Sequence, residues 1–407
     1  MTLFNFLKSK FTAHNQHWLI YAQVVGSLLS LGQLLILTRV LDSEVFGQYR
    51  YGIALTMILP LFFLSGISNA ITSITANNDE GVFFQAIKMY LRSTRIPSII
   101  SILIAFILLY FNFLFLGYLL LIIGIFSPLY QTVQLYNSYL NGKQDYKRVF
   151  LYGLIPDIGT VLSVITAAIL FPTQPIIILG IFFLANILST LVPFFFTIRS
   201  YKIKDTCDKS SENLMSLSRT VSQSNIIQGI GGQIDKVITF HLISSSGLAV
   251  YSIVTLVAQQ FRGFQKILYA ILLPKQSLNR DHTKFYKALW LYLIASALFC
   301  VVYIIAAPLI FSILFPEYIA FVYLSQLASL AIVFAPLTFF TLSTLHSRNN
   351  RKTIFEYTLA TTLSSSILLF IGSILLGVDG VVFAFIISSI ISGFMGIFFL
   401  RKFKTPQ

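Results

Sequence analysis

The chain has 407 residues, of which 56% are hydrophobic and only 10% are charged. Soluble proteins carry about 25% charged residues, and so few charges could not cover a water-soluble surface. The composition therefore excludes a soluble protein and predicts an all-α polytopic membrane protein. A net charge of +14 would suggest nucleic-acid binding in a soluble protein, but in a membrane protein Lys and Arg first set the topology.

Metal, cofactor and nucleotide sites are not expected. The two cysteines, Cys207 and Cys300, lie far apart and match no metal or redox spacing. The loops expected in the cytoplasm also lack the phosphate-binding pattern G-x-x-x-x-G-K-[ST]. We therefore expect no metal and no cofactor, and ATP is not expected to be the direct energy source.

Twelve membrane spans are predicted from the distances between successive groups of basic residues, because about 20 apolar residues are needed to cross a bilayer. The first two spans are expected near 17–40 and 51–75, on either side of the charged turn DSEVFG. The first apolar run is longer than that of a signal peptide and has no small-residue cleavage site. We therefore expect it to be retained as a true span.

Four later stretches are each long enough for two spans joined by a tight turn. They contain 47, 50, 60 and 48 residues without a basic side chain, at 96–142, 149–198, 288–347 and 353–400. A turn-forming sequence interrupts each of them: the residues from Asn112 to Gly117, then FPTQP, LFPEY and LGVDG. A further pair of spans is expected within 220–274, around ISSSG, which brings the total to twelve.

The positions of the basic residues predict that both chain termini lie in the cytoplasm. With that orientation, 25 of the 28 Lys and Arg residues flank the cytoplasmic ends of the spans, where positive charge resists translocation. Only Arg39 and Arg50 fall at the outer side, and Lys236 falls within a span. The charge balance is therefore mainly a topology signal, and it implies no nucleic-acid partner.

An internal repeat divides the predicted spans into two lobes. The longest polar segment, 199–218, is expected to be a cytoplasmic linker between an N-lobe of six spans, 1–198, and a C-lobe of six spans, 219–407. Because six is even, both lobes would enter the membrane from the same side, as parallel repeats related by an axis along the membrane normal. A central cavity between the lobes is the expected consequence.

The repeat is clearest at the first turn of each lobe. A shift of 202 residues pairs Tyr49 with Tyr251 and Arg39 with His241. A duplicated scaffold without transport activity would show the same repeat. The short outer loops favour a transporter, because none of them is long enough to carry a separate active site.

Local sequences within these spans resemble a known family. The segment ILTRVLDSEVFGQYRYGIALTMILPLFFLSGISNAIT, 36–72, resembles the first hairpin of Wzx-type polysaccharide flippases, members of the multidrug/oligosaccharidyl-lipid/polysaccharide (MOP) exporter superfamily. GGQIDKVITFHLISSSGLAVYS, with YAILLP after it, is similar to the family's seventh and eighth spans, and Asp235 matches its seventh-span Asp. LGVDGVVFAFIISSIISG resembles its last hairpin. Ala249 stands where the family usually has glycine, which leaves the subfamily open.

The resemblance implies a flippase for O-antigen or a similar repeat unit. Such a protein moves undecaprenyl diphosphate-linked oligosaccharide from the cytoplasmic to the periplasmic leaflet by alternating access. The resemblance also implies a place in the bacterial cytoplasmic (inner) membrane, a coupling cation (proton or sodium), and polysaccharide-assembly partners in the same bilayer.

Charged residues inside predicted spans are the candidate functional residues, because a central Asp, Lys or Arg costs about 2.5–3.5 kcal/mol on insertion. Asp157 follows Pro156, which frees a backbone carbonyl and opens the helix. Two interpretations stay open: a cavity carboxylate that binds a coupling cation or the sugar, and an interhelical hydrogen-bond anchor.

Asp235 and Lys236 are adjacent, so their side chains should point about 100° apart on a helix. They follow the polar stretch SQSNIIQGIGGQ, whose glycines loosen the helix and allow neighbours to approach closely. This stretch is typical of a hydrated cavity wall that contacts sugar hydroxyls or a coupling ion. Structural pairing with the other lobe is the alternative.

The remaining candidates are basic or neutral polar side chains. Arg39 and Arg50 frame the first outer turn, His241 is the repeat partner of Arg39, and Arg262 lies on the inner half of the eighth span. Arginine can bind a diphosphate bidentately, but it can also anchor at the membrane interface or pair with acidic residues of the turn. Gln259 offers a donor and an acceptor that could serve a sugar or helix packing.

Three competing functions are considered. A cation-coupled multidrug exporter of the same superfamily would need a more acidic cavity. A membrane-embedded polysaccharide polymerase or acyltransferase would be expected to carry a large outer loop or a catalytic His or Asp pair near one surface. A pure scaffold is the third.

Overall fold

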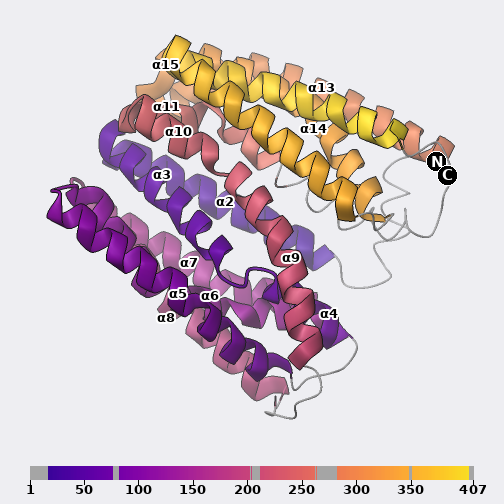
Figure 1. Ribbon diagram of the computed structural model, residues 1–407. Helices are drawn as coiled ribbons and strands as arrows, with labels where there is room; N and C mark the ends of the chain where they lie inside the picture. Colours follow the sequence, from indigo (N-terminus) through magenta and orange to yellow (C-terminus); the bar gives the residue numbers. More distant parts are fainter. Residues whose placement is uncertain are drawn as a thin grey trace. The chain divides into compact units, whose positions relative to one another are not determined.

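The computed structural model describes residues 17–76, 82–201, 203, 211–261, 263, 282–347 and 351–402, and these residues form helices joined by short turns (Figure 1). The first part contains α2 (His17–Val40), α3 (Ser43–Ile58), η1 (Leu59–Phe62), α4 (Ile67–Ala76), α5 (Val82–Tyr110), α6 (Leu114–Gly142), α7 (Tyr146–Leu170) and α8 (Pro175–Tyr201). The second part contains α9 (Ser211–Gly231), α10 (Ile234–Leu242), α11 (Ser245–Val254), α13 (His282–Leu314), η3 (Pro316–Phe321), α14 (Val322–Ser347) and α15 (Arg351–Lys402).

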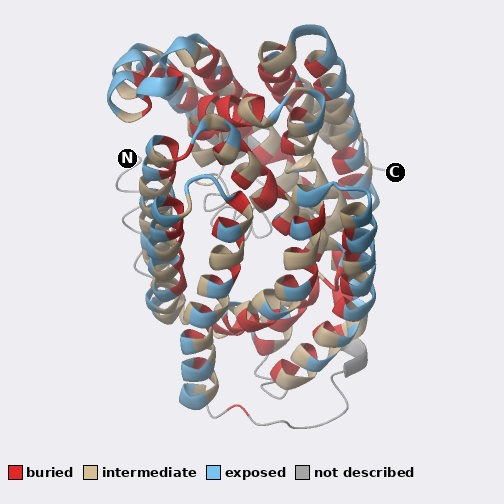
Figure 2. Cartoon of the chain, turned by 90° about the vertical axis from the view of Figure 1, so that its left-hand side faces the viewer, coloured by how far each residue is buried: buried red, intermediate tan, exposed pale blue. Residues whose placement is uncertain are grey.

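The long helices match a protein that crosses a membrane many times. Among the described residues, eight helices are long and apolar enough to span a bilayer, or nine if the bent pair formed by Ser43–Phe62 and Ile67–Ala76 counts as one span. Exposed residues run along the outer faces of these helices, and buried residues lie on the faces toward their neighbours (Figure 2). The predicted all-α polytopic architecture is confirmed at this level.

The predicted hairpin turns lie where the sequence places them. Asn112, with a φ of 63°, separates α5 from α6. The sequence FPTQ separates Leu170 at the end of α7 from Pro175 at the start of α8. Both hairpins are therefore confirmed. Their turn residues are ones that leave helical geometry readily.

The long element α15 is itself a hairpin. Its backbone leaves helical geometry at Gly377, where φ is 59° and ψ is −132°. A Cβ atom on Gly372 would lie 2.9 Å from the carbonyl carbon of Gly380, so the residues before and after Gly377 are in close contact. The turn predicted at LGVDG is therefore confirmed, and only glycine adopts this backbone conformation without strain.

The second predicted span is broken rather than straight. Its two parts, Ser43–Phe62 and Ile67–Ala76, are bent by 63°. Pro60 lies in the 3-10 turn before the bend, where a proline cannot donate a backbone hydrogen bond. Beyond the bend, the backbone N–H of Gly66 donates to Oγ of Ser222 on α9 at 2.8 Å. A side chain from α9 thus satisfies a backbone group that the break leaves free.

The seventh predicted span is also interrupted. α9 ends at Gly231 and α10 begins at Ile234, with a turn at Gly232 and Gln233. The glycines that were expected to loosen this helix therefore lie at the break itself. The break gives α10 its own N-terminus, with Asp235 in its first turn.

The chain divides into two compact units, each built from two segments. Unit 1 consists of Met1–Leu41 and Gly52–Ile230, and unit 2 consists of Asp42–Tyr51 and Gly231–Gln407. The first turns of α3 therefore belong with α10 and α15, whereas α9 belongs with the N-terminal helices. As a result, Arg50 belongs to the same unit as Asp235.

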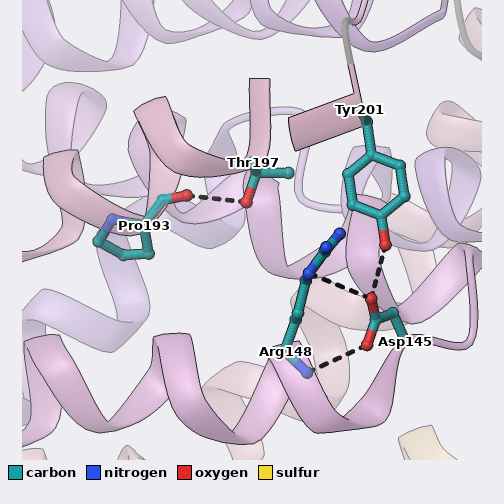
Figure 3. A network of polar contacts seen from close by, with 5 residues as sticks. All are labelled: Asp145, Arg148, Pro193, Thr197 and Tyr201. Atoms are coloured by element: carbon teal, nitrogen blue, oxygen red, sulfur yellow. Dashed lines mark hydrogen bonds and ion pairs between the residues drawn. The ribbon is translucent and has the colours of Figure 1, made fainter. Parts of the chain in front are cut away.

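In unit 1, a polar network ties the start of α7 to the end of α8 (Figure 3). Oδ1 of Asp145 accepts the backbone N–H of Arg148 at 3.1 Å and caps α7. Oδ2 of Asp145 accepts the hydroxyl of Tyr201 at 2.7 Å and lies 3.5 Å from Nε of Arg148. The guanidinium of Arg148 lies 5.0 Å from the centre of the Tyr201 ring. One turn earlier on α8, Thr197 donates to the carbonyl of Pro193 at 2.7 Å.

The helix bounds repeat along the chain with the offset seen in the sequence. α2 ends at Val40 and α10 ends at Leu242, and α3 begins at Ser43 and α11 begins at Ser245. Each pair is separated by 202 positions. These helix ends at the first turn of each predicted lobe thus have the same offset as the sequence alignment.

Gly47 lies against the backbone of Ser245 within unit 2. A Cβ atom on Gly47 would lie 3.2 Å from the Cα atom of Ser245 and closer still to its carbonyl group. The repeat counterpart of Gly47 is Ala249, which carries a Cβ atom and is fully buried. The two halves therefore use this position differently, and only the first requires glycine.

We expect Gly47→Ala to lower the free energy of unfolding by about 1–3 kcal/mol, because the Ser245 backbone would have to move. Gly32→Ala is the matched control, since nothing lies within 4 Å of its Cβ position and alanine favours a helix. The measurement is the thermal unfolding midpoint of both variants in detergent. Equal midpoints for Gly47→Ala and wild type would contradict the close contact.

Candidate functional site

Three charged residues belong to unit 2 and interact through their charges. Arg50 lies on the part of α3 that belongs to this unit, and Asp235 and Lys236 lie in the first turn of α10. Asp235 interacts electrostatically with Arg50 and with Lys236, and Arg50 also acts on Lys236. We call these three residues the charged cluster.

The carboxylate of Asp235 is held by two hydrogen bonds. Oδ2 accepts the hydroxyl of Tyr251, a fully buried residue of α11, at 2.8 Å. Oδ1 accepts the backbone N–H of Lys236 at 2.9 Å. A carboxylate at the start of a helix is also favoured by the helix dipole. The position of Asp235 is thus fixed by the break before α10 and by a side chain from α11.

The two basic residues of the cluster have different surroundings. Lys236 is buried, and its Nζ donates to Oε1 of Gln233 at 2.6 Å. Nε of Arg50 is buried and has no hydrogen-bond partner among the described residues. With two basic residues and one acidic residue, the charged cluster has a formal charge of +1.

Neutral polar side chains extend from this cluster along the helix after α11. Oγ1 of Thr255 donates to the backbone carbonyl of Tyr251 at 2.6 Å, and Nε2 of Gln259 donates to Oγ1 of Thr255 at 2.9 Å. Gln259 is therefore linked to Tyr251 through Thr255. Tyr251, Thr255 and Gln259 are spaced four residues apart, so their polar groups lie on one helical face that begins at the partner of Asp235.

His241 lies at the opposite end of α10 from the cluster and has partners of its own. Its Nε2 lies 2.9 Å from the hydroxyl of Tyr51, and the Tyr51 ring stacks on Phe240 with 3.9 Å between ring centres. The side chain of His241 is exposed. It therefore forms a second small site, at the end of α10.

Two sequence candidates lie in unit 1. Arg39 is exposed in the last turn of α2, at the position that His241 occupies on α10. Asp157 is exposed within the candidate span Tyr146–Leu170, and a Cβ atom on Gly26 would lie 3.9 Å from its Oδ2. Its charge also reaches the phenols of Tyr130 and Tyr136 on α6.

The candidates thus separate into groups. Arg50, Asp235 and Lys236 belong to unit 2, whereas Arg39 and Asp157 belong to unit 1. Arg262 lies outside the residues whose side chains are described.

Two partner residues were not expected from the sequence as site residues. The repeat pairs Tyr251 with Tyr49 and so marks its position, but nothing in the sequence indicates its bond to Asp235. Gln233 lies directly before the helix start, where an amide could have been anticipated as a partner for a nearby lysine.

Arginine and lysine beside an anchored carboxylate can hold an anion. A guanidinium presents paired N–H donors that match two oxygens of a phosphate. The formal charge of +1 and the Nε of Arg50, which has no hydrogen-bond partner in the described part of the chain, leave capacity for such a ligand. A cationic ligand would meet net repulsion here.

We expect Asp235→Asn to lower the free energy of unfolding by about 1–3 kcal/mol, because it leaves two neighbouring cations without their carboxylate. Asp379→Asn is the matched control: Asp379 also accepts a tyrosine hydroxyl, that of Tyr323 at 3.0 Å, but lies outside the cluster. Thermal unfolding of both purified variants measures the difference. Equal loss in the two variants would show that the charge of Asp235 does not balance Arg50 and Lys236.

Known proteins with similar folds are membrane transporters. The solved structure of lipid II flippase MurJ, in an inward closed conformation, matches with a TM-score of 0.73 and 17% identity, over 94% of this chain and 87% of MurJ. An inward-facing multidrug resistance MATE family transporter of the MOP superfamily matches with a TM-score of 0.69 and 12% identity, over 93% of this chain and 94% of that chain. These likenesses show a MurJ- and MATE-like fold.

Sequence comparison identifies relatives concerned with polysaccharides. A Shigella flexneri protein assigned to O-antigen transport is 24% identical over 255 residues, which are 58% of this chain and 60% of that protein. The chain thus spans about 60% of the length of this curated relative. By their names, the Shigella protein and the MATE family protein are transporters and MurJ is a flippase.

A family model described as "Polysaccharide biosynthesis protein" matches residues 12–259. The match includes α2 to α11, and therefore all three residues of the charged cluster. Because it covers more than half of the sequence, the chain belongs to the polysaccharide biosynthesis protein family, as the sequence resemblance predicted.

Proposed function

We propose that this protein is a flippase that moves undecaprenyl diphosphate-linked oligosaccharide from the cytoplasmic to the periplasmic leaflet. The observation that carries the proposal is the charged cluster of Arg50, Asp235 and Lys236 on helices of a transporter fold. The assignment of the Shigella relative to O-antigen transport and the flippase activity named for MurJ support the same substrate class.

The chemistry of the substrate fits the cluster. A diphosphate carries negative charge into a low-dielectric region, where it needs a cation and hydrogen-bond donors. Nε of Arg50 is a buried hydrogen-bond donor. The negative charge of Asp235 reduces the formal charge of the cluster from +2 to +1. The net positive charge disfavours the runner-up function, export of cationic drugs.

The proposed architecture has twelve spans in two lobes, 1–198 and 219–407, joined by a cytoplasmic linker at 199–218. The 202-residue offset between helix bounds and the MurJ- and MATE-like fold support parallel repeats. In this proposal the lobes enclose a central cavity and expose it to each side of the membrane in turn.

The proposed setting is the bacterial inner membrane, with both termini in the cytoplasm. A proton or sodium ion would drive the cycle. Polysaccharide-assembly proteins of the same membrane would supply and consume the substrate.

Transport in proteoliposomes tests this function and the role of Arg50 together. We expect wild-type protein to flip fluorescent lipid-linked oligosaccharide, and Arg50→Lys to reduce the initial rate about tenfold, because an ammonium keeps the charge but lacks the planar pair of donors. Arg199→Lys, an exposed position at the end of α8, is the control and should flip normally. Absence of flipping by the wild type would refute the function, and a fully active Arg50→Lys would remove Arg50 from the site.

The proposed orientation is tested at the two ends of α8. In a variant with Cys207 and Cys300 replaced by serine, we expect Thr173→Cys to react with an impermeant thiol reagent in intact cells and Ser200→Cys to stay unlabelled. Both positions are exposed, so the difference reports sidedness alone. The reverse pattern would place the termini outside and invert the orientation.

A further inference from the structure

The helices α2 and α7 of unit 1 pack against each other, and we call the line of contact between them the seam. It contains no residue of the charged cluster. Trp18 on α2 lies 5.4 Å from Phe150 on α7, measured between ring centres. Eight residues later on α2, Gly26 faces Asp157, which lies seven residues after Phe150. The two helices therefore run side by side in the same direction over this distance.

One end of the seam is a cluster of aromatic rings. Trp18 lies 5.7 Å from Tyr21 at an interplanar angle of 82°, and His17 lies 5.3 Å from Trp18. Tyr21 is 51% exposed, so this cluster presents ring surface rather than a closed core. Aromatic faces carry negative charge density, which attracts the polarised C–H groups of a sugar ring.

The other end of the seam carries hydrogen-bonding groups. Asp157 is exposed within a candidate span, where a carboxylate must face water or polar groups and not lipid. The charge of Asp157 acts on the phenols of Tyr130 and Tyr136 on α6, and the Tyr136 hydroxyl donates to the backbone carbonyl of Tyr152 on α7 at 3.5 Å. This combination suits a ligand with many hydroxyl groups.

The two ends are separated by the length of a short oligosaccharide. Phe150 and Asp157 lie on the same face of α7, about 10 Å apart along the helix axis. That distance leaves room for more than one sugar ring and is too long for a single ion bound at both ends.

We propose that the seam between α2 and α7 is a saccharide-binding subsite, in which Trp18 and Tyr21 stack on sugar rings and Asp157 accepts hydrogen bonds from sugar hydroxyls. The proposal deepens, and rests on, the proposed flippase function. It separates recognition of the saccharide in unit 1 from recognition of the diphosphate in unit 2.

Trp18 can report on this subsite directly, because the chain has only two tryptophans. The other, Trp290, is 64% exposed on α13 and can be replaced by Trp290→Phe. In nanodiscs, the emission of Trp18 is then followed while oligosaccharide released from the lipid-linked precursor by mild acid is added. Undecaprenyl diphosphate without sugar is added in a parallel titration.

We expect a saturable change of Trp18 emission with the free oligosaccharide and none with undecaprenyl diphosphate. Asp157→Asn should weaken the apparent affinity for the oligosaccharide about tenfold, because it removes one charge-assisted hydrogen bond. Asp379→Asn, which lies in unit 2, should leave the affinity unchanged.

Two results would overturn the subsite. The first is quenching of Trp18 by brominated lipid with no response to saccharide, which would make the rings an ordinary interfacial belt. The second is flipping of substrate by the Trp290→Phe protein without any response of Trp18, which would leave the flippase function intact. A saccharide response in a preparation that does not flip would instead support the subsite and count against the function.

Discussion

A charge buried away from water needs a partner, and this requirement governs the arrangement of unit 2. Arg50 and Lys236 would each be costly alone, and Asp235 offsets both. Asp235 can do so because the helix breaks at Gly232 and Gln233, which starts α10 directly before the carboxylate. The hydroxyl of Tyr251 then fixes its orientation.

Helix breaks impose the same requirement on the backbone. The bend after Phe62 leaves backbone groups without partners, and Ser222 on α9 provides one for Gly66. The division into units agrees with these contacts. α9 belongs to the same unit as the bend, and the start of α3 belongs to the same unit as α10. Broken helices in a membrane protein occur where other protein groups replace the lost bonds.

The sequence predicted the hairpins well because their signals are local. Asn112, the FPTQP turn and Gly377 interrupt apolar runs of known length, and each lies between two helices. The 63° bend was not predicted, since the hydropathy of 51–75 is continuous and Pro60 alone does not specify an angle. The bend depends on packing against α9, which is distant in sequence.

The site was predicted in part. A charged residue in an apolar span is visible in the sequence, so Asp235 and Lys236 could be selected, and Arg50 could be selected as a basic residue at the first outer turn. Their meeting could not be predicted, because Arg50 and Asp235 are far apart in the chain and no repeat signal links them. The partner Tyr251 was visible only as the repeat mate of Tyr49, and the ring contacts of Trp18 with Phe150 left no pattern in the sequence.

The most direct measurement is a cryo-electron microscopy structure of the protein with undecaprenyl diphosphate-linked oligosaccharide bound. We expect diphosphate oxygens at about 2.7–2.9 Å from the guanidinium of Arg50, the distance of a charge-assisted hydrogen bond. Asp235 should remain bonded to Tyr251 in that state. A diphosphate bound elsewhere, with the charged cluster unchanged and without ligand, would contradict the role assigned to Arg50, Asp235 and Lys236.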